Sequence, residues 1–77
     1  MSRAILINAR AEALFVSNLQ RSDRPGPAIV ASAIRQTIRQ FGSRGCAERV
    51  AYAFGETPET AMPRMAWARS QVQATYR

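Results

Sequence analysis

The chain has 77 residues, of which 47% are hydrophobic and 21% are charged, and its formal net charge is +6. This balance excludes intrinsic disorder, and the length allows one small domain over residues 1–77. Because there is no histidine, only one cysteine and no apolar run near the ~18 residues of a membrane span, we expect a cytoplasmic protein without metal, cofactor, disulfide or membrane segment.

Helical periodicity without alternating strand patterns predicts an all-α fold, a compact bundle of about four helices. Breaks rich in glycine and proline fall at residues 21–27, 42–45 and 55–58. We therefore expect helices over residues 2–20, 27–41, 45–54 and 60–75.

The first predicted helix is apolar on two sides. One side faces the core, and a second arc needs another partner. Either this helix lies centrally among the other three, or its second arc meets a second copy of the chain. We favour the second interpretation, which predicts a homodimer. The predicted interface arc consists of Ile5, Leu6, Ala9, Ala13 and Val16.

The second predicted helix starts at Pro27 after Gly26 and stops at Gly42, the residue type that most often ends a helix. Its outer face carries Arg35 and Arg39, spaced four residues apart. Such a face is either a solvated surface or a strip that contacts phosphates.

The third and fourth predicted helices meet in the segment VAYAFGETPET, residues 50–60. Cys46, in the third helix, is expected to be a small buried packing residue. In the fourth helix, Pro63 would cost about 3 kcal/mol inside a helix that began at Pro58. We therefore predict a separate turn or a short helical segment at residues 57–59 and a main helix capped by Thr60.

These last two helices have features of a DNA-reading helix-turn-helix. Apolar residues precede Gly55 at the spacing that this motif needs, but Glu56 and Arg64 stand where apolar residues are usual. Residues 43–77 are also the less basic part, with five arginines and three glutamates, against six arginines and two acids in residues 1–42. The candidate DNA contacts are Arg64, Arg69, Thr57, Thr60, Arg44, Arg35 and Arg39.

Trp67 is the single tryptophan of the chain. A lone tryptophan in a small helical protein usually anchors a core or a dimer seam, and its alternative role is a hot spot for a partner. We place it with the interface residues.

Two segments carry a resemblance. ALFVSNLQRSD (13–23) and FGSRGCAERVAYAFGETPETAMPRMAWARSQV (41–72) resemble a group of small uncharacterised proteins, rich in arginine and alanine, from high-GC Gram-positive bacteria. The resemblance implies a compact cytoplasmic bacterial domain and no site residues. Segment 47–65 also resembles helix-turn-helix regulators in general.

The sequence argues against an enzyme, because it has no histidine and no glycine-rich phosphate loop and is too short for a deep pocket. Two functions are left. The first is a small basic DNA-binding protein, dimeric and linked to transcription, which would bind double-stranded DNA. The second is an adaptor that docks on an acidic protein partner. Neither takes a small-molecule substrate.

Overall fold

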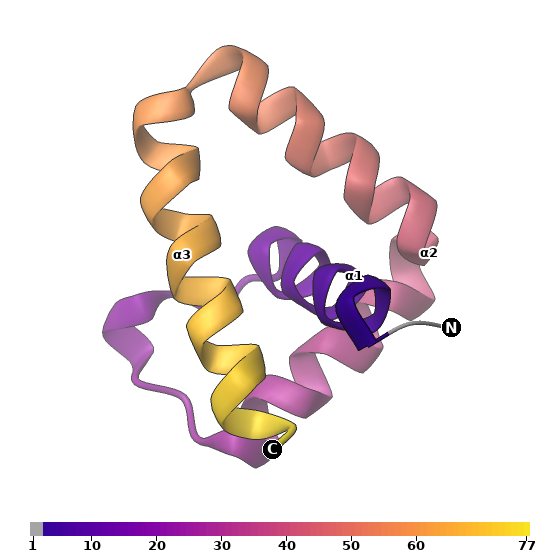
Figure 1. Cartoon of the computed structure of the whole chain (residues 1–77), viewed down its shortest axis with the longest axis vertical. Coiled ribbons are helices and arrows are strands. Elements are labelled where there is room, and N and C mark those ends of the chain that lie inside the picture. The colour runs from indigo at the N-terminus through magenta and orange to yellow at the C-terminus, as the bar shows by residue number, and fades with distance from the viewer. Residues whose placement is uncertain (1–2) are drawn as a thin grey trace.

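The computed structural model describes the backbone of residues 3–77 and the side chains of residues 8–77. This part of the chain forms three α-helices and one short 3-10 helix, η1, and it contains no strand (Figure 1). The all-α prediction is therefore confirmed. In chain order the elements are α1 (Arg3–Val16), η1 (Arg21–Asp23), α2 (Pro27–Glu56) and α3 (Pro58–Thr75). None of these helices is apolar over enough of its length to cross a membrane.

Helix α2 spans both the second and the third predicted helices. It begins as expected, with Gly26 as N-cap and Pro27 in the first turn. At Gly42 the backbone has φ 71° and ψ 164°, a conformation that almost only glycine adopts, and helical geometry then resumes. The predicted break at 42–45 is therefore a kink at one residue, and the expected four helices are three. Figure 1 shows the two halves of α2 running in different directions.

Helix α1 ends at Val16, short of the expected residue 20, because the side chain of Ser17 competes with the helical backbone. The Ser17 hydroxyl donates to the carbonyl of Leu14 at 2.6 Å and accepts from the Leu19 N–H at 3.3 Å. The chain then turns through η1 before α2 begins. The predicted start at residue 2 lies outside the described residues.

Helix α3 begins at Pro58, and only Thr57 separates it from α2. Residues 58 and 59 are helical but continuous with the main helix, so the predicted separate segment and the predicted start at Thr60 are wrong. Pro58 occupies the first turn, where its missing N–H costs nothing. Pro63 does lie inside the helix, and it has no N–H to donate to the carbonyl of Glu59, four residues earlier. Because both residues are exposed, this carbonyl can bind water instead. A one-residue link is also shorter than the turn of about 3–4 residues in a helix-turn-helix.

In Figure 1, α1 lies inside a frame that α2 and α3 form around it, and the view is oblique to its axis. It packs against both helices, which also pack against each other. This arrangement explains why α1 is apolar on two sides within a single chain. It corresponds to the central placement of the first helix, so the two-sided pattern gives no support to a dimer.

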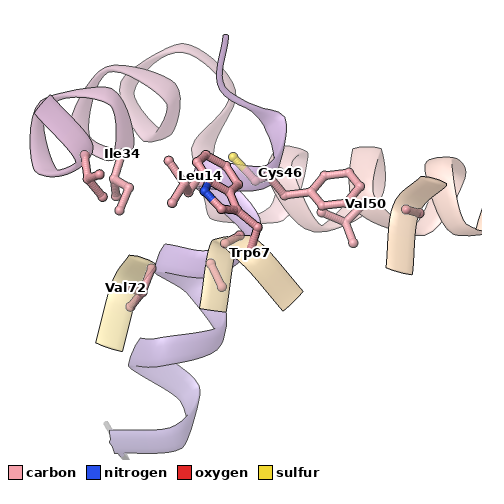
Figure 2. Packing of buried hydrophobic residues seen from close by; sticks show 12 residues of the cluster. Leu14, Ile34, Cys46, Val50, Trp67 and Val72 are labelled. Atoms are coloured by element: carbon pink, nitrogen blue, oxygen red, sulfur yellow. The ribbon is translucent and has the colours of Figure 1, made fainter. Parts of the chain in front are cut away.

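One core joins the three helices. Figure 2 shows side chains from α1, α2 and α3 converging on it. The single buried polar residue of the described part is Thr37, whose hydroxyl donates to the Ala33 carbonyl at 2.7 Å. The buried apolar residues are Ala11, Ala13, Leu14, Phe15, Val30, Ile34, Cys46, Val50, Ala61, Trp67, Ala68 and Val72.

Candidate functional site

A groove lies beside the kink at Gly42. Because α2 changes direction there, its two halves form two walls, and the C-terminal end of α1 closes the bottom between them. The groove has a volume of about 810 Å³. We call it the α2 groove.

The α2 groove is apolar at its base and carries an exposed apolar side chain on each wall. Phe15, at the end of α1, and Phe41, before the kink, are among the apolar residues of its lining. Ile29 on the first wall is 56% exposed, and Tyr52 on the second is 71% exposed. Exposure of large apolar side chains to water is unfavourable, so binding of a partner that covered them would be stabilised by their burial. The remaining lining residues are Val16, Ser17, Asn18, Leu19, Ser32, Ala33, Gln36, Thr37, Gln40, Glu48 and Arg49.

Arg49 is held in a defined position on the second wall. Its guanidinium carbon lies 3.7 Å from the centre of the Phe41 ring, and its Nη1 donates to the Gly45 carbonyl at 3.4 Å. The cation–π contact bridges the kink from one half of α2 to the other. The side chain of Arg49 is therefore already ordered where it presents positive charge at the groove. Glu48 is the only acidic residue among the described residues of the lining.

Arg64, the first candidate for a DNA contact, points into the molecule. Its Nε donates to the Phe15 carbonyl at 2.8 Å, and its Nη2 donates to the carbonyls of Ser17 at 3.0 Å and Leu19 at 2.9 Å. A longer contact of 3.5 Å reaches the Leu14 carbonyl. Burial lowers the pKa of this guanidinium from its ordinary value. Arg64 caps the C-terminal end of α1, where unpaired carbonyls and the negative end of the helix dipole favour a cation.

The other candidate DNA contacts are exposed, but they do not form one donor-rich helix face. The Arg69 Nη2 donates to Asn8 Oδ1 at 3.2 Å. The hydroxyls of Thr57 and Thr60 donate to backbone carbonyls of the helix junction, at 3.4 Å and 3.1 Å. Near its start, α3 exposes Met62, Pro63 and Ala66, which offer no side-chain donors. The remaining exposed candidates are Arg35, Arg39 and Arg44 on α2.

The predicted interface residues lie mostly in the interior. Trp67 is 9% exposed, and its ring packs in the core of this chain. Ala13 is fully buried, and Ala9 and Val16 are partly buried. Trp67 therefore anchors the core of this chain, and the chain's own helices cover both Trp67 and Ala13. Ile5 and Leu6 lie outside the described side chains.

Sequence reasoning missed the α2 groove and the exposed pair Ile29 and Tyr52. Ile29 falls outside the stripe of Val30, Ile34, Ile38 and Phe41, and a large apolar residue beside a complete core stripe could have indicated a second apolar face. Tyr52 gives no such signal. The groove itself depends on the direction of the kink, which no spacing encodes.

Cys46 is fully buried in the core, as predicted. Burial raises the pKa of its thiol above the ordinary 9.0, Arg49 acts in the opposite direction, and Glu12 adds a smaller increase. Within the described residues, no three His, Cys, Asp or Glu side chains are placed to hold a metal ion.

Comparison with known proteins gives no relative: no protein-family model matches the chain, and no curated protein or solved structure matches it. The assignment of a function therefore depends on the geometry alone.

Proposed function

We propose that the chain is a non-catalytic protein-interaction module that holds an apolar helix of an acidic partner in the α2 groove. The observation that carries this proposal is the groove itself, with Ile29 and Tyr52 exposed on opposite walls above an apolar base. A V-shaped space between two helical segments suits the apolar face of a third helix, which docks through residues spaced three and four apart.

Charge supports an acidic partner. The chain carries +6 overall, and Arg49 stands inside the groove while Arg35, Arg39 and Arg44 are exposed on the same helix. A helix whose polar flanks carry aspartate or glutamate would be attracted to this charge before contact and oriented by it. A neutral or basic helix would lack that attraction.

The test is recovery of a partner from a native lysate with tagged protein in three forms: wild type, the groove variant Ile29→Ser with Tyr52→Ser, and the control Met62→Ser. Met62 is 63% exposed but does not line the groove. We expect wild type and control to retain the same protein, with an acidic amphipathic helix, and the groove variant to lose it. Retention by all three forms would contradict the proposal.

Duplex DNA binding is the second candidate, and the exposure of Arg35, Arg39, Arg44 and Arg69 favours it. This function would use contacts to the phosphate backbone, since α3 has few exposed donors near its start. Absence of duplex binding at about 50 mM salt would remove it. A homodimer, in which a second copy fills the α2 groove, would appear in light scattering as a particle of twice 8.5 kDa.

A further inference from the structure

A second hollow lies on another part of the molecule, between η1 and α3. It has a volume of about 600 Å³. Two arginines on the η1 side face the outer surface of α3, and we call this hollow the arginine cleft. It is lined by Arg21, Arg24, Pro25, Pro63, Ala66, Trp67, Ser70 and Gln71.

The turn that carries Arg21 and Arg24 is fixed by its own hydrogen bonds. Asp23 Oδ2 accepts from the Gln20 N–H at 2.8 Å, and the Asp23 N–H donates back to the Gln20 carbonyl at 3.0 Å. The Arg24 N–H donates to the Arg21 carbonyl at 3.1 Å. Arg21 belongs to η1 and Arg24 follows it as the C-cap, and both residues line the same hollow.

Backbone strain accompanies this pairing. Arg24 has φ 47° and ψ 54°, a left-handed backbone conformation that residues other than glycine, asparagine and aspartate rarely adopt. An arginine thus occupies a backbone conformation in which glycine would have a lower conformational free energy.

The chemical character of the cleft is that of an anion site with an apolar wall. No acidic side chain of the described residues lines it, and the carboxylate of Asp23, the nearest acid in sequence, is engaged by the Gln20 backbone. Two guanidinium groups offer forked donors that match phosphate oxygens. Ser70 and Gln71 of α3 add neutral hydrogen-bonding groups, and Pro25, Pro63 and Trp67 provide apolar surface.

We propose that the arginine cleft binds the phosphate of a nucleotide, either free or within a nucleic acid strand. Arg21 and Arg24 hold the phosphate oxygens, and the base or sugar lies against Pro25 and Pro63. A further hollow, lined by Gln20, Arg21, Ser22 and Arg24, adjoins the same two arginines and gives room for the next phosphate. This site is separate from the α2 groove, and the two proposals can fail independently.

The test is a titration of ¹⁵N-labelled protein with ATP, with a short DNA duplex and with a short single strand, at about 50 mM salt. The readouts are the Nε–H signals of Arg21 and Arg24 and the indole N–H signal of Trp67. The variant Arg21→Gln with Arg24→Asn removes both charges, and asparagine tolerates the left-handed conformation of residue 24. The matched control, Arg10→Gln with Arg77→Gln, removes the same charge at two residues that line neither hollow.

We expect at least one of the three ligands to shift these signals and the cleft variant to weaken its binding about tenfold or more. The control should weaken binding by no more than about twofold, the general effect of a lower net charge. Binding of ATP alone identifies a free nucleotide, and binding of a strand or duplex alone identifies nucleic acid. No binding of any ligand, or equal weakening by both variants, would overturn the proposal.

Discussion

The Nε of Arg64 donates a hydrogen bond to the backbone carbonyl of Phe15 at 2.8 Å and thereby ties α3 to the C-terminal end of α1. The guanidinium carbon of Arg64 lies 5.6 Å from the centre of the Phe15 ring and 5.3 Å from the centre of the Trp67 ring. One side chain thus satisfies the end of one helix and packs against two aromatic rings. This arrangement fixes the bottom of the α2 groove, because Phe15 and Leu19 belong to its lining.

Arg64→Gln should destabilise the protein by about 2–4 kcal/mol, because it removes a charged donor from partly buried carbonyls at and after the end of α1. Urea unfolding followed by the fluorescence of Trp67 measures the effect. Arg69→Gln serves as the control, since Arg69 is exposed and makes one contact to Asn8. Its cost should be below about 1 kcal/mol. Equal costs for the two variants would mean that Arg64 is not a structural cap.

Gly42→Ala should destabilise the protein by about 1–3 kcal/mol, because alanine avoids φ 71° with ψ 164°. The cost is conformational, since a Cβ added at this position would meet no atom within 4 Å apart from the neighbouring residues and the nearby backbone of α2 itself. Gly55→Ala, near the end of α2, has equal space and no positive φ, so it should stabilise by about 0.5–1 kcal/mol. Thermal unfolding of both variants and of wild type measures the two changes in stability. Stabilisation by both would contradict the kink at Gly42.

The unfolding free energy should fall as the pH rises above about 9, through the titration of Cys46. Burial raises the pKa of this thiol in the folded state, so the unfolded state ionises first and is favoured at high pH. The loss begins near the ordinary pKa of 9.0 and ends above the raised one. Urea unfolding of wild type and Cys46→Ala between about pH 8 and pH 10.5 should show a smaller slope for the variant. Parallel curves would mean that the thiol does not contribute.

The sequence predicted the elements whose signals are local. Pro27 after Gly26 marked the start of α2, and the absence of strand periodicity predicted the all-α class. The role of Arg64 depends on contacts 45 or more residues away in sequence, so no local pattern could show it. The helix start was misplaced because the free-energy cost of Pro63 inside a helix depends on whether water can reach the carbonyl it leaves without a donor. The α2 groove was missed because it depends on the direction of the kink at Gly42.

Ile29→Ser with Tyr52→Ser should leave the unfolding free energy within about 0.5 kcal/mol of wild type, because both side chains are more than half exposed. A binding face can lose its apolar groups without harming the fold, whereas a core cannot. Trp67→Ala, by contrast, should cost about 3–5 kcal/mol. Denaturant unfolding of the two variants provides the comparison. Strong destabilisation by the serine pair would show that Ile29 and Tyr52 support the fold.

Site-specific photo-crosslinking most directly tests the central claim that the α2 groove holds a partner helix. A photoreactive phenylalanine analogue replaces Tyr52 in one protein and Met62 in a second, since both positions are exposed and only position 52 lines the groove. After irradiation in native lysate, mass spectrometry should find a cross-link from position 52 to an acidic amphipathic helix of another protein, and none from position 62. Equal cross-linking from both positions, or none from position 52, would contradict the proposed function.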